Sequence, residues 1–92
     1  MGGRRNEPQR LTLLVRAYCH LCDDMRDALA PLAASFGWAI EELDIDADDA
    51  LEKRWSDSVP VLLAGDRELC RYRIDEAAVT AFLLGEGTAK SR

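Results

Sequence analysis

The sequence predicts one small domain of the α/β class with the element order β-α-β-α-β-β-α. A short, nearly continuous apolar run at residues 11–17 is followed directly by a segment with helical periodicity, and a second such pair covers residues 38–55. Two further strand-like runs are joined by Gly65-Asp66, a two-residue turn typical of a hairpin. We therefore expect a right-handed parallel βαβ unit combined with an antiparallel hairpin.

Length and composition are those of a globular domain. The chain has 92 residues, which fits one domain, and no apolar run approaches the roughly 20 residues of a membrane span. Arg16 interrupts the first apolar segment too early for a signal peptide, so we expect a cytoplasmic protein without a membrane partner. The net charge of −5 argues against nucleic acid as a partner. We expect a monomer.

The two ends of the chain lack apolar periodicity. Residues 1–10 contain Gly, Asn and Pro and predict a flexible N-terminal tail, and residues 86–92 predict a flexible C-terminal tail. The folded domain is expected at residues 11–85. Within it, the apolar run at 11–17 fits a strand that is buried on both faces.

The first helix is predicted from Leu21, because apolar residues recur from there to Phe36 at intervals of three and four. Pro31 lacks a backbone donor and clashes with the preceding turn, so we expect a kink or an early end near Ala30. Gly37 is a natural stop for the rest of the helix.

The next two elements are a strand and a short helix. Apolar residues at 38, 40, 43 and 45 change phase at Glu41-Glu42, which predicts a strand with an irregularity. Asp49 and Glu52 have the spacing of a capping box and predict a helix of about two turns.

The last third of the chain predicts the hairpin and a closing helix. Residues 59–64 and 67–72 are the two strands. Asp75 is placed to cap the final helix, and Gly85 is expected to end it.

Cys19-His20-Leu21-Cys22 stands between the first strand and the first helix. The unpaired amides and the dipole at a helix N-terminus stabilise a thiolate, which makes Cys19 the expected nucleophile. Cys22, one turn further in, is placed to attack a mixed disulfide on Cys19. Two alternatives remain open: metal or iron–sulfur ligation, and a redox-inactive binding module whose thiols are incidental.

The chain resembles a glutaredoxin of the thioredoxin-like superfamily, in particular the small bacterial glutaredoxin-like proteins. The resemblance rests on Cys19-His20-Leu21-Cys22, on Val59-Pro60 and on the element order. It implies a thioredoxin-like fold with a four-stranded mixed sheet flanked by helices, and a cis peptide at Val59-Pro60 that faces the dithiol. It also implies thiol–disulfide exchange on protein or glutathione disulfides, without a bound cofactor but with glutathione as a possible reductant.

Further site residues follow from the same resemblance. Arg16, three positions before Cys19, matches a basic residue that contacts the carboxylate of glutathione; the alternative is an arginine that only extends from a strand end to solvent. Asp75 matches an acidic residue that holds the other end of glutathione. The family's Gly-Gly turn is absent, and residues 69–72 take its place.

Tyr18 and His20 flank Cys19 in the sequence. A protonated His20 would add positive charge beside Cys19 and lower the pKa of that thiol, whereas Asp23 and Asp24 act in the opposite direction. Tyr18 is a candidate for shielding the site or contacting substrate, with simple packing as the alternative.

The third cysteine, Cys70, lies in a predicted strand and is expected to be a small buried hydrophobic residue. A zinc site that joins it to Cys19, His20 and Cys22 is not expected, because the adjacent residues 19 and 20 would both have to point at one ion. The acidic run at 41–49 lacks the glycine and terminal glutamate of a calcium loop. We therefore predict no metal site.

Overall fold

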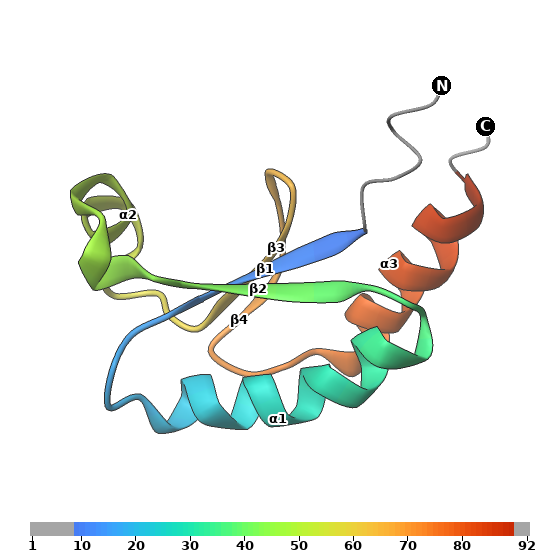
Figure 1. The fold of residues 1–92 in the computed structure, drawn as a ribbon, viewed down its shortest axis with the longest axis horizontal. Helices are drawn as coiled ribbons and strands as arrows, with labels where there is room; N and C mark the ends of the chain where they lie inside the picture. The colour runs from blue at the N-terminus through green and yellow to red at the C-terminus, as the bar shows by residue number, and fades with distance from the viewer. Residues whose placement is uncertain (1–8, 90–92) are drawn as a thin grey trace.

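The computed structural model describes residues 9–89, with side chains as far as residue 85, and its elements follow the predicted order (Figure 1). No helix in this part of the chain is long and apolar enough to cross a bilayer. Residues 1–8 and 90–92 of the predicted tails lie outside the described residues, whereas Arg10 belongs to the first strand and residues 86–89 continue the last helix, so the folded domain extends beyond the predicted 11–85. The elements are β1 (Arg10–Val15), α1 (His20–Ser35), β2 (Ala39–Asp44), η2 (Ile45–Ala47), α2 (Asp49–Trp55), β3 (Val61–Ala64), β4 (Arg67–Arg71) and α3 (Glu76–Ala89).

The four strands form one mixed sheet in the order β2-β1-β3-β4. β1 and β2 are parallel, as the βαβ unit requires, whereas β3 runs antiparallel to both β1 and β4. Gly65, with φ of +63°, makes the turn between β3 and β4. The sheet therefore has the topology that the element order predicted, with β1 in a central position.

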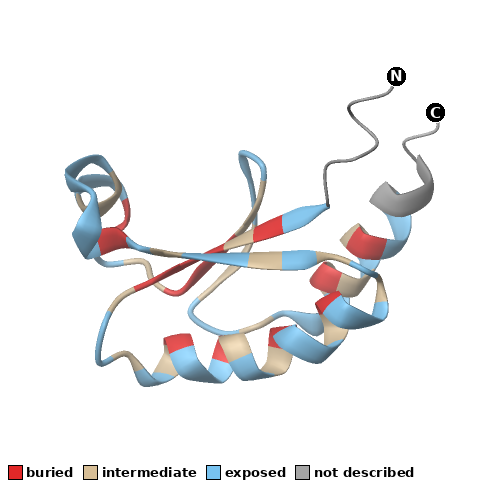
Figure 2. Ribbon diagram, in the orientation of Figure 1, coloured by how far each residue is buried: buried red, intermediate tan, exposed pale blue. Residues whose placement is uncertain are grey.

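The sheet separates two hydrophobic cores, and β1 contributes to both of them. Leu13 packs with buried residues of α1 and α3 on one face, where Figure 2 shows buried positions along the inner side of α1. The next residue, Leu14, packs on the other face with Ile45 and Trp55. Because both faces are covered, the strand is apolar at nearly every position, which is the pattern that the sequence shows.

Helix α1 continues through Pro31 to Ser35, so the predicted kink or early end near Ala30 is wrong. Pro31 is exposed, and the carbonyl of Asp27 that it leaves without a helical donor also belongs to an exposed residue. Water can satisfy that group, while the buried face of the helix stays intact. Gly37, with φ of +74°, follows the end of the helix, as predicted.

Strand β2 pairs with β1 in continuous register, so the irregularity predicted at Glu41-Glu42 is absent. The apolar phase changes because the two faces of this edge strand are covered in different places. Ile40 packs on the core formed with α1 and α3, and Leu43 packs on the core formed with α2. The register shift in the sheet occurs instead between β3 and β4, at Leu62/Leu63.

Two predicted helix boundaries also need correction. The N-cap of α2 is Asp48 rather than Asp49, because Asp48 Oδ1 accepts the amides of Ala50 and Leu51 at 2.9 and 3.1 Å. Helix α3 does not end at Gly85 but runs to Ala89. Gly85 does not take the positive φ that would terminate a helix there.

Candidate dithiol site

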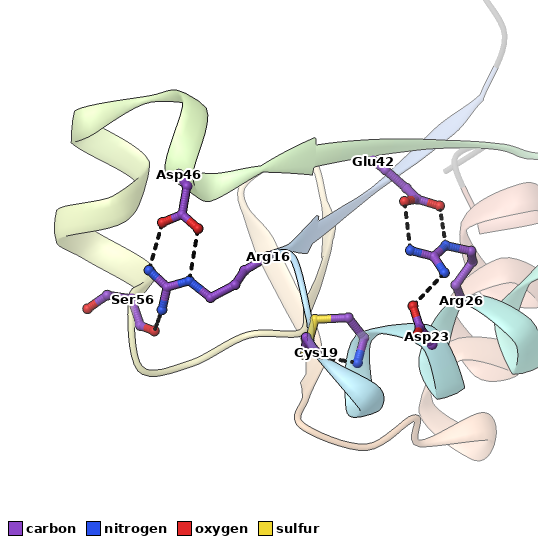
Figure 3. Close-up of a disulfide and its surroundings, with 8 residues drawn as sticks. Arg16, Cys19, Asp23, Arg26, Glu42, Asp46 and Ser56 are labelled. Atoms are coloured by element: carbon purple, nitrogen blue, oxygen red, sulfur yellow. Dashed lines mark hydrogen bonds and ion pairs between the residues drawn. A yellow bond between two sulfur atoms is a disulfide. The ribbon is translucent and has the colours of Figure 1, made fainter.

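Cys19 and Cys22 form a disulfide at the start of α1 (Figure 3). Their Cα atoms are 5.2 Å apart, within the normal range for a disulfide. Cys22 is 1% exposed and belongs to the core beneath the sheet, whereas Cys19 is only half-buried. Of the two cysteines, Cys19 is therefore the more exposed one.

Cys19 is the N-cap residue of α1. Its Sγ accepts the backbone N–H of Cys22 at 3.1 Å, and its carbonyl accepts the N–H of Asp23 at 3.2 Å. The partial positive charge of a helix N-terminus acts at this position. After reduction, the same amide and helix terminus would face the sulfur of Cys19 and favour its thiolate form.

The sheet brings three loops to the edge where the dithiol lies. Leu14 of β1 pairs with Val61 of β3, and Val61 pairs with Arg71 of β4. The residues after β1, before β3 and after β4 therefore lie side by side. We call residues 18–22 the dithiol turn and residues 56–60 the proline loop.

The proline loop contains a cis peptide bond between Val59 and Pro60. Pro60 is fully buried, and Val59 is half-buried. Val59 packs against the same core cluster as Cys19 and also against the core on the other face of the sheet. The structure thus packs the two half-buried residues Val59 and Cys19 against the same core cluster.

Tyr18 and His20 are both exposed on either side of Cys19. The side chain of Tyr18 has 105% relative exposure, and its backbone has φ of +59°, a conformation that is rare for a bulky residue. No packing interaction accounts for an aromatic ring in this position. Strained, exposed residues of this kind are concentrated at functional sites, which keeps Tyr18 a candidate for substrate contact.

Arg16 extends from the end of β1 toward η2 and α2, away from Cys19 in Figure 3. Its Nε and Nη2 donate to the Asp46 carboxylate at 3.1 and 2.8 Å, and its Nη1 donates to the Ser56 carbonyl at 2.9 Å. Glu52 lies 3.6 Å from Nη2. The hydrogen bond to Asp46 raises the pKa of Arg16 and lowers the pKa of Asp46. Contact between Arg16 and a glutathione carboxylate stays a prediction, and it would have to compete with these partners.

Asp75 and Cys70 lie on the far side of the site from Arg16. Asp75 caps α3, because its Oδ1 accepts the N–H of Ala78 at 3.0 Å. Cys70 is a free, half-buried thiol on β4. Burial raises the pKa of the Cys70 thiol, with a backbone hydrogen bond from Asp75 acting against it. A raised pKa makes Cys70 a poor nucleophile at neutral pH.

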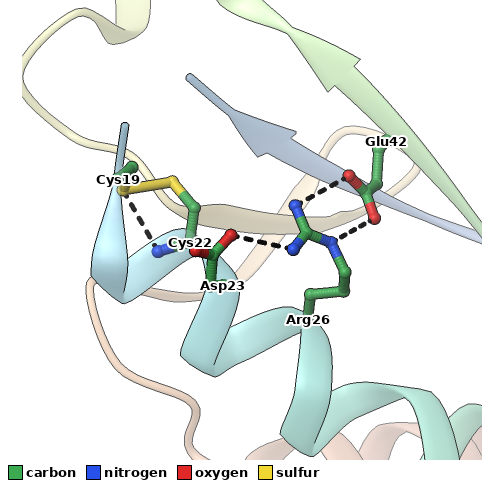
Figure 4. A network of polar contacts seen from close by, with 5 residues as sticks. All are labelled: Cys19, Cys22, Asp23, Arg26 and Glu42. Atoms are coloured by element: carbon green, nitrogen blue, oxygen red, sulfur yellow. Dashed lines mark hydrogen bonds and ion pairs between the residues drawn. A yellow bond between two sulfur atoms is a disulfide. The ribbon is translucent and has the colours of Figure 1, made fainter. Parts of the chain in front are cut away.

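An ion-pair network joins the first turn of α1 to β2 (Figure 4). Arg26 Nη1 donates to Asp23 Oδ1 at 2.9 Å, while its Nε and Nη2 donate to the Glu42 carboxylate at 2.6 and 3.1 Å. Asp23 directly follows Cys22 in the chain. Arg26 therefore partly neutralises the carboxylate closest in sequence to the dithiol.

A cleft of about 240 Å³ opens beside the dithiol turn, between α1 and the residues after β4. Its apolar wall is formed by Leu21, Met25 and Ile74, and the charged residues Asp24 and Arg73 complete the lining. Leu21 belongs to the dithiol turn, so the cleft adjoins this turn.

The sequence did not predict three sets of side-chain contacts around the site. Arg71 donates to Ser58 Oγ, Tyr72 donates to the Asp57 carbonyl, and Arg26 pairs with Asp23 and Glu42. Only the Asp23–Arg26 pair had a local signal, namely its i,i+3 spacing on a helix. Within the described residues, no group of three or more His, Cys, Asp or Glu side chains is arranged to hold a metal ion.

Several known proteins are similar to this chain in sequence or in structure. Uncharacterized proteins of Mycobacterium tuberculosis and Mycobacterium bovis are 30% identical over 81 residues, which covers 83% of this chain and 82% of theirs. The solution structure of protein Ne2328 from Nitrosomonas europaea has 35% identity and a TM-score of 0.71, over 83% of this chain and 92% of that one.

A more distant match concerns the fold alone. The germline-specific thioredoxin Deadhead from Drosophila melanogaster is 21% identical, with a TM-score of 0.57 over 88% of this chain and 83% of that one. The family model described as the glutaredoxin-like domain (DUF836) matches residues 10–84, from the first residue of β1 into α3. With its cysteine pair at disulfide distance on a thioredoxin-like fold, this chain belongs to the glutaredoxin-like domain family.

Proposed function

We propose that this protein is a thiol–disulfide oxidoreductase in which Cys19 is the nucleophile and Cys22 the resolving thiol. The observation that carries the proposal is the position of Cys19 Sγ at the N-cap of α1, 3.1 Å from the amide of Cys22. Cys19 is half-buried, whereas Cys22 is 1% exposed. This asymmetry separates the attacking thiol from the resolving one.

The proposed reaction consists of two successive thiol–disulfide exchange steps. The Cys19 thiolate attacks one sulfur of a substrate disulfide, forms a mixed disulfide and releases the other substrate sulfur as a thiolate. Cys22, after losing its proton, attacks Cys19 Sγ, closes the Cys19–Cys22 bond and releases the second substrate thiolate. The substrate gains two electrons, and the protein dithiol loses them.

Protein disulfides and glutathione mixed disulfides are the proposed substrates. Exposed Tyr18 and the cleft beside Leu21 favour a polypeptide, because both offer apolar surface at the dithiol turn. The engagement of Arg16 with Asp46 and Ser56 speaks against a free cation waiting for the glutathione carboxylate. Glutathione or a dithiol reductase would supply the electrons that regenerate the reduced site.

The test is to trap the mixed disulfide with the Cys22→Ser variant. Incubation with a disulfide-containing peptide or with oxidised glutathione should give a stable adduct on Cys19, read by intact mass under non-reducing conditions. Cys70→Ser is the matched control, and it should retain full exchange activity because Cys70 takes no part. A Cys22→Ser protein that forms no adduct with either disulfide would rule out the mechanism.

The same preparation distinguishes the other two interpretations of the dithiol. Anaerobic purification followed by an absorbance scan would reveal a coloured cluster if Cys19 were a metal ligand. A Cys19 thiol with a pKa near the free value of about 8.5, and no exchange activity, would indicate a binding module instead. A colourless protein that reduces disulfides supports the oxidoreductase.

A further inference from the structure

The proline loop is held by side chains that reach it from outside. Residues 56–60 belong to no helix or strand, and the backbone holds them at two points: Ser58 N–H donates to the Trp55 carbonyl, and Tyr72 N–H donates to the Pro60 carbonyl, both at 2.8 Å. Three consecutive residues each accept a hydrogen bond of 2.9 Å from a side chain near the ends of β1 and β4. The donors and acceptors are Arg16 Nη1 and the Ser56 carbonyl, Tyr72 Oη and the Asp57 carbonyl, and Arg71 Nη1 and Ser58 Oγ.

Arg16 and Arg71 donate hydrogen bonds to the proline loop with the same arrangement of guanidinium nitrogens. Each uses Nε and Nη2 to bind both oxygens of a carboxylate, which leaves Nη1 to reach the loop. For Arg16 the carboxylate is Asp46, and for Arg71 it is Glu68, at 2.6 and 2.8 Å. A bidentate carboxylate fixes the plane of the guanidinium. The remaining N–H therefore points in a defined direction, and a lysine cannot reproduce this arrangement.

Tyr72 binds the loop at two points. Its backbone N–H donates to the Pro60 carbonyl at 2.8 Å, while its hydroxyl donates to the Asp57 carbonyl at 2.9 Å. The residue has φ of +69°, a conformation that glycine adopts most easily. A tyrosine at this strained position is explained by the hydroxyl contact, which glycine cannot make.

The geometry points to Arg16, Arg71 and Tyr72 as positioning residues that set the distance and orientation of Val59-Pro60 relative to the dithiol turn. This inference rests on the proposed function, since it concerns how a disulfide substrate that contacts the half-buried Val59 meets Cys19 Sγ. Loosening the loop spreads its positions and weakens productive binding. The thiol chemistry of Cys19 is set by α1 and is unaffected.

The test measures steady-state exchange with a disulfide-containing peptide for Tyr72→Phe and Arg16→Gln. In each variant KM should rise about three- to tenfold, the size that one such hydrogen bond carries, with kcat unchanged. The reduction potential of the dithiol in a glutathione buffer should stay at the wild-type value. Arg10→Gln is the matched control, because it removes an exposed arginine–glutamate pair at the other end of β1 and should change neither quantity.

Amide hydrogen exchange tests, independently of enzyme activity, whether these side chains hold the proline loop in place. In Tyr72→Phe, the amides of residues 57–59 should exchange faster than in wild type, while those of α1 stay protected. Unchanged exchange in the loop, an unchanged KM in an active protein, or a potential that shifts together with KM would overturn the inference. A wild-type protein without any exchange activity would refute the proposed function, and the amide measurement would still decide the positioning role.

Discussion

The dithiol turn and the proline loop face the same surface, but different interactions hold them in place. The dithiol turn is fixed by the backbone of a regular element: Cys19 caps α1, and Cys22 is anchored in the core. The proline loop lies outside regular structure: its Val59-Pro60 end packs in the core, and residues 56–58 accept hydrogen bonds from the side chains of Arg16, Arg71 and Tyr72. The first half of the site is thus held by helix α1, whereas residues 56–58 of the second half depend largely on side-chain hydrogen bonds.

This difference assigns the two halves separate tasks. The backbone amides at the N-terminus of α1 act directly on the sulfur, so the dithiol turn governs the thiolate and its potential. The proline loop carries no titrating group that the proposed reaction uses, so its contribution is to the placement of substrate. Mutations in the two halves should therefore change different measured quantities, and the following predictions are ordered by the size of the expected effect.

The largest effect is expected on the dithiol half, from Met25→Ala. Met25 is 1% exposed and packs in the core beneath the dithiol turn, so its truncation leaves a cavity. We expect a loss of about 2–5 kcal/mol in the free energy of unfolding, measured by urea titration. Asp24→Ala, at the exposed neighbouring position, is the control and should stay within about 0.5 kcal/mol of wild type. Equal losses in both variants would show that α1 does not anchor this half.

Tyr18→Gly tests whether the dithiol turn also contacts substrate. Glycine adopts φ of +59° without steric cost, and the tyrosine ring packs on nothing, so the free energy of unfolding should not fall. The KM for a peptide disulfide should rise about threefold or more if the ring binds substrate, because a buried aromatic contact is worth about 0.5–1.5 kcal/mol. A protein that is less stable yet equally active would assign Tyr18 a role in folding instead.

Arg26→Gln should change the potential of the dithiol without affecting the proline loop. Its loss leaves Asp23 and Glu42 without their counter-ion, and the added negative field destabilises the Cys19 thiolate. We expect the reduction potential to fall by about 10–20 mV, since the pairs are largely exposed. Glu42→Gln removes a negative charge and should move the potential in the opposite direction. Shifts of the same sign in the two variants would contradict an electrostatic cause.

The smallest expected effect is a change in the free energy of unfolding at acidic pH. It arises from the carboxylates that bind Arg16 and Arg71, the two arginines that contact the proline loop. Hydrogen bonds from Arg16 and Arg71 lower the pKa of Asp46 and of Glu68. A carboxyl whose pKa is lower in the folded state stabilises the fold above its unfolded pKa, and this stabilisation is lost as the pH falls through the folded pKa. The relevant window therefore lies below about pH 4.

Asp46→Asn should accordingly flatten the decline of stability in this window, measured by urea titrations at a series of acidic pH values. The change should be small because Asp46 is exposed and screened by solvent. Asp49→Asn, at an exposed position on the same segment, serves as the control. An acid limb of the same slope in wild type and Asp46→Asn would mean that the Arg16 contact does not contribute to stability.

Much of the fold was predictable because its signals are local. The element order, the parallel βαβ unit, the hairpin at Gly65-Asp66 and the cap at Asp75 all follow from spacing within a few residues. The predictions that were wrong concern positions where solvent exposure or packing against other elements, rather than the local sequence, determines the structure. Pro31 is tolerated because it faces solvent, and the apolar phase of β2 changes because the coverage of the sheet changes along the strand.

The sequence by itself determined the dithiol half of the site. A CxxC pair between a strand and a helix places the first sulfur at a helix N-terminus, and this depends only on residues next to one another in the chain. The resemblance also predicted the cis peptide at Val59-Pro60, but only the tertiary structure decided which side chains hold the proline loop. The residues that hold it are separated from their partners by 40, 13 and 15 positions, and no local spacing records which side chain meets which carbonyl. Arg16 illustrates the point, because its place in the sequence suggested a ligand for glutathione, whereas the fold brings Asp46 and Ser56 within its reach.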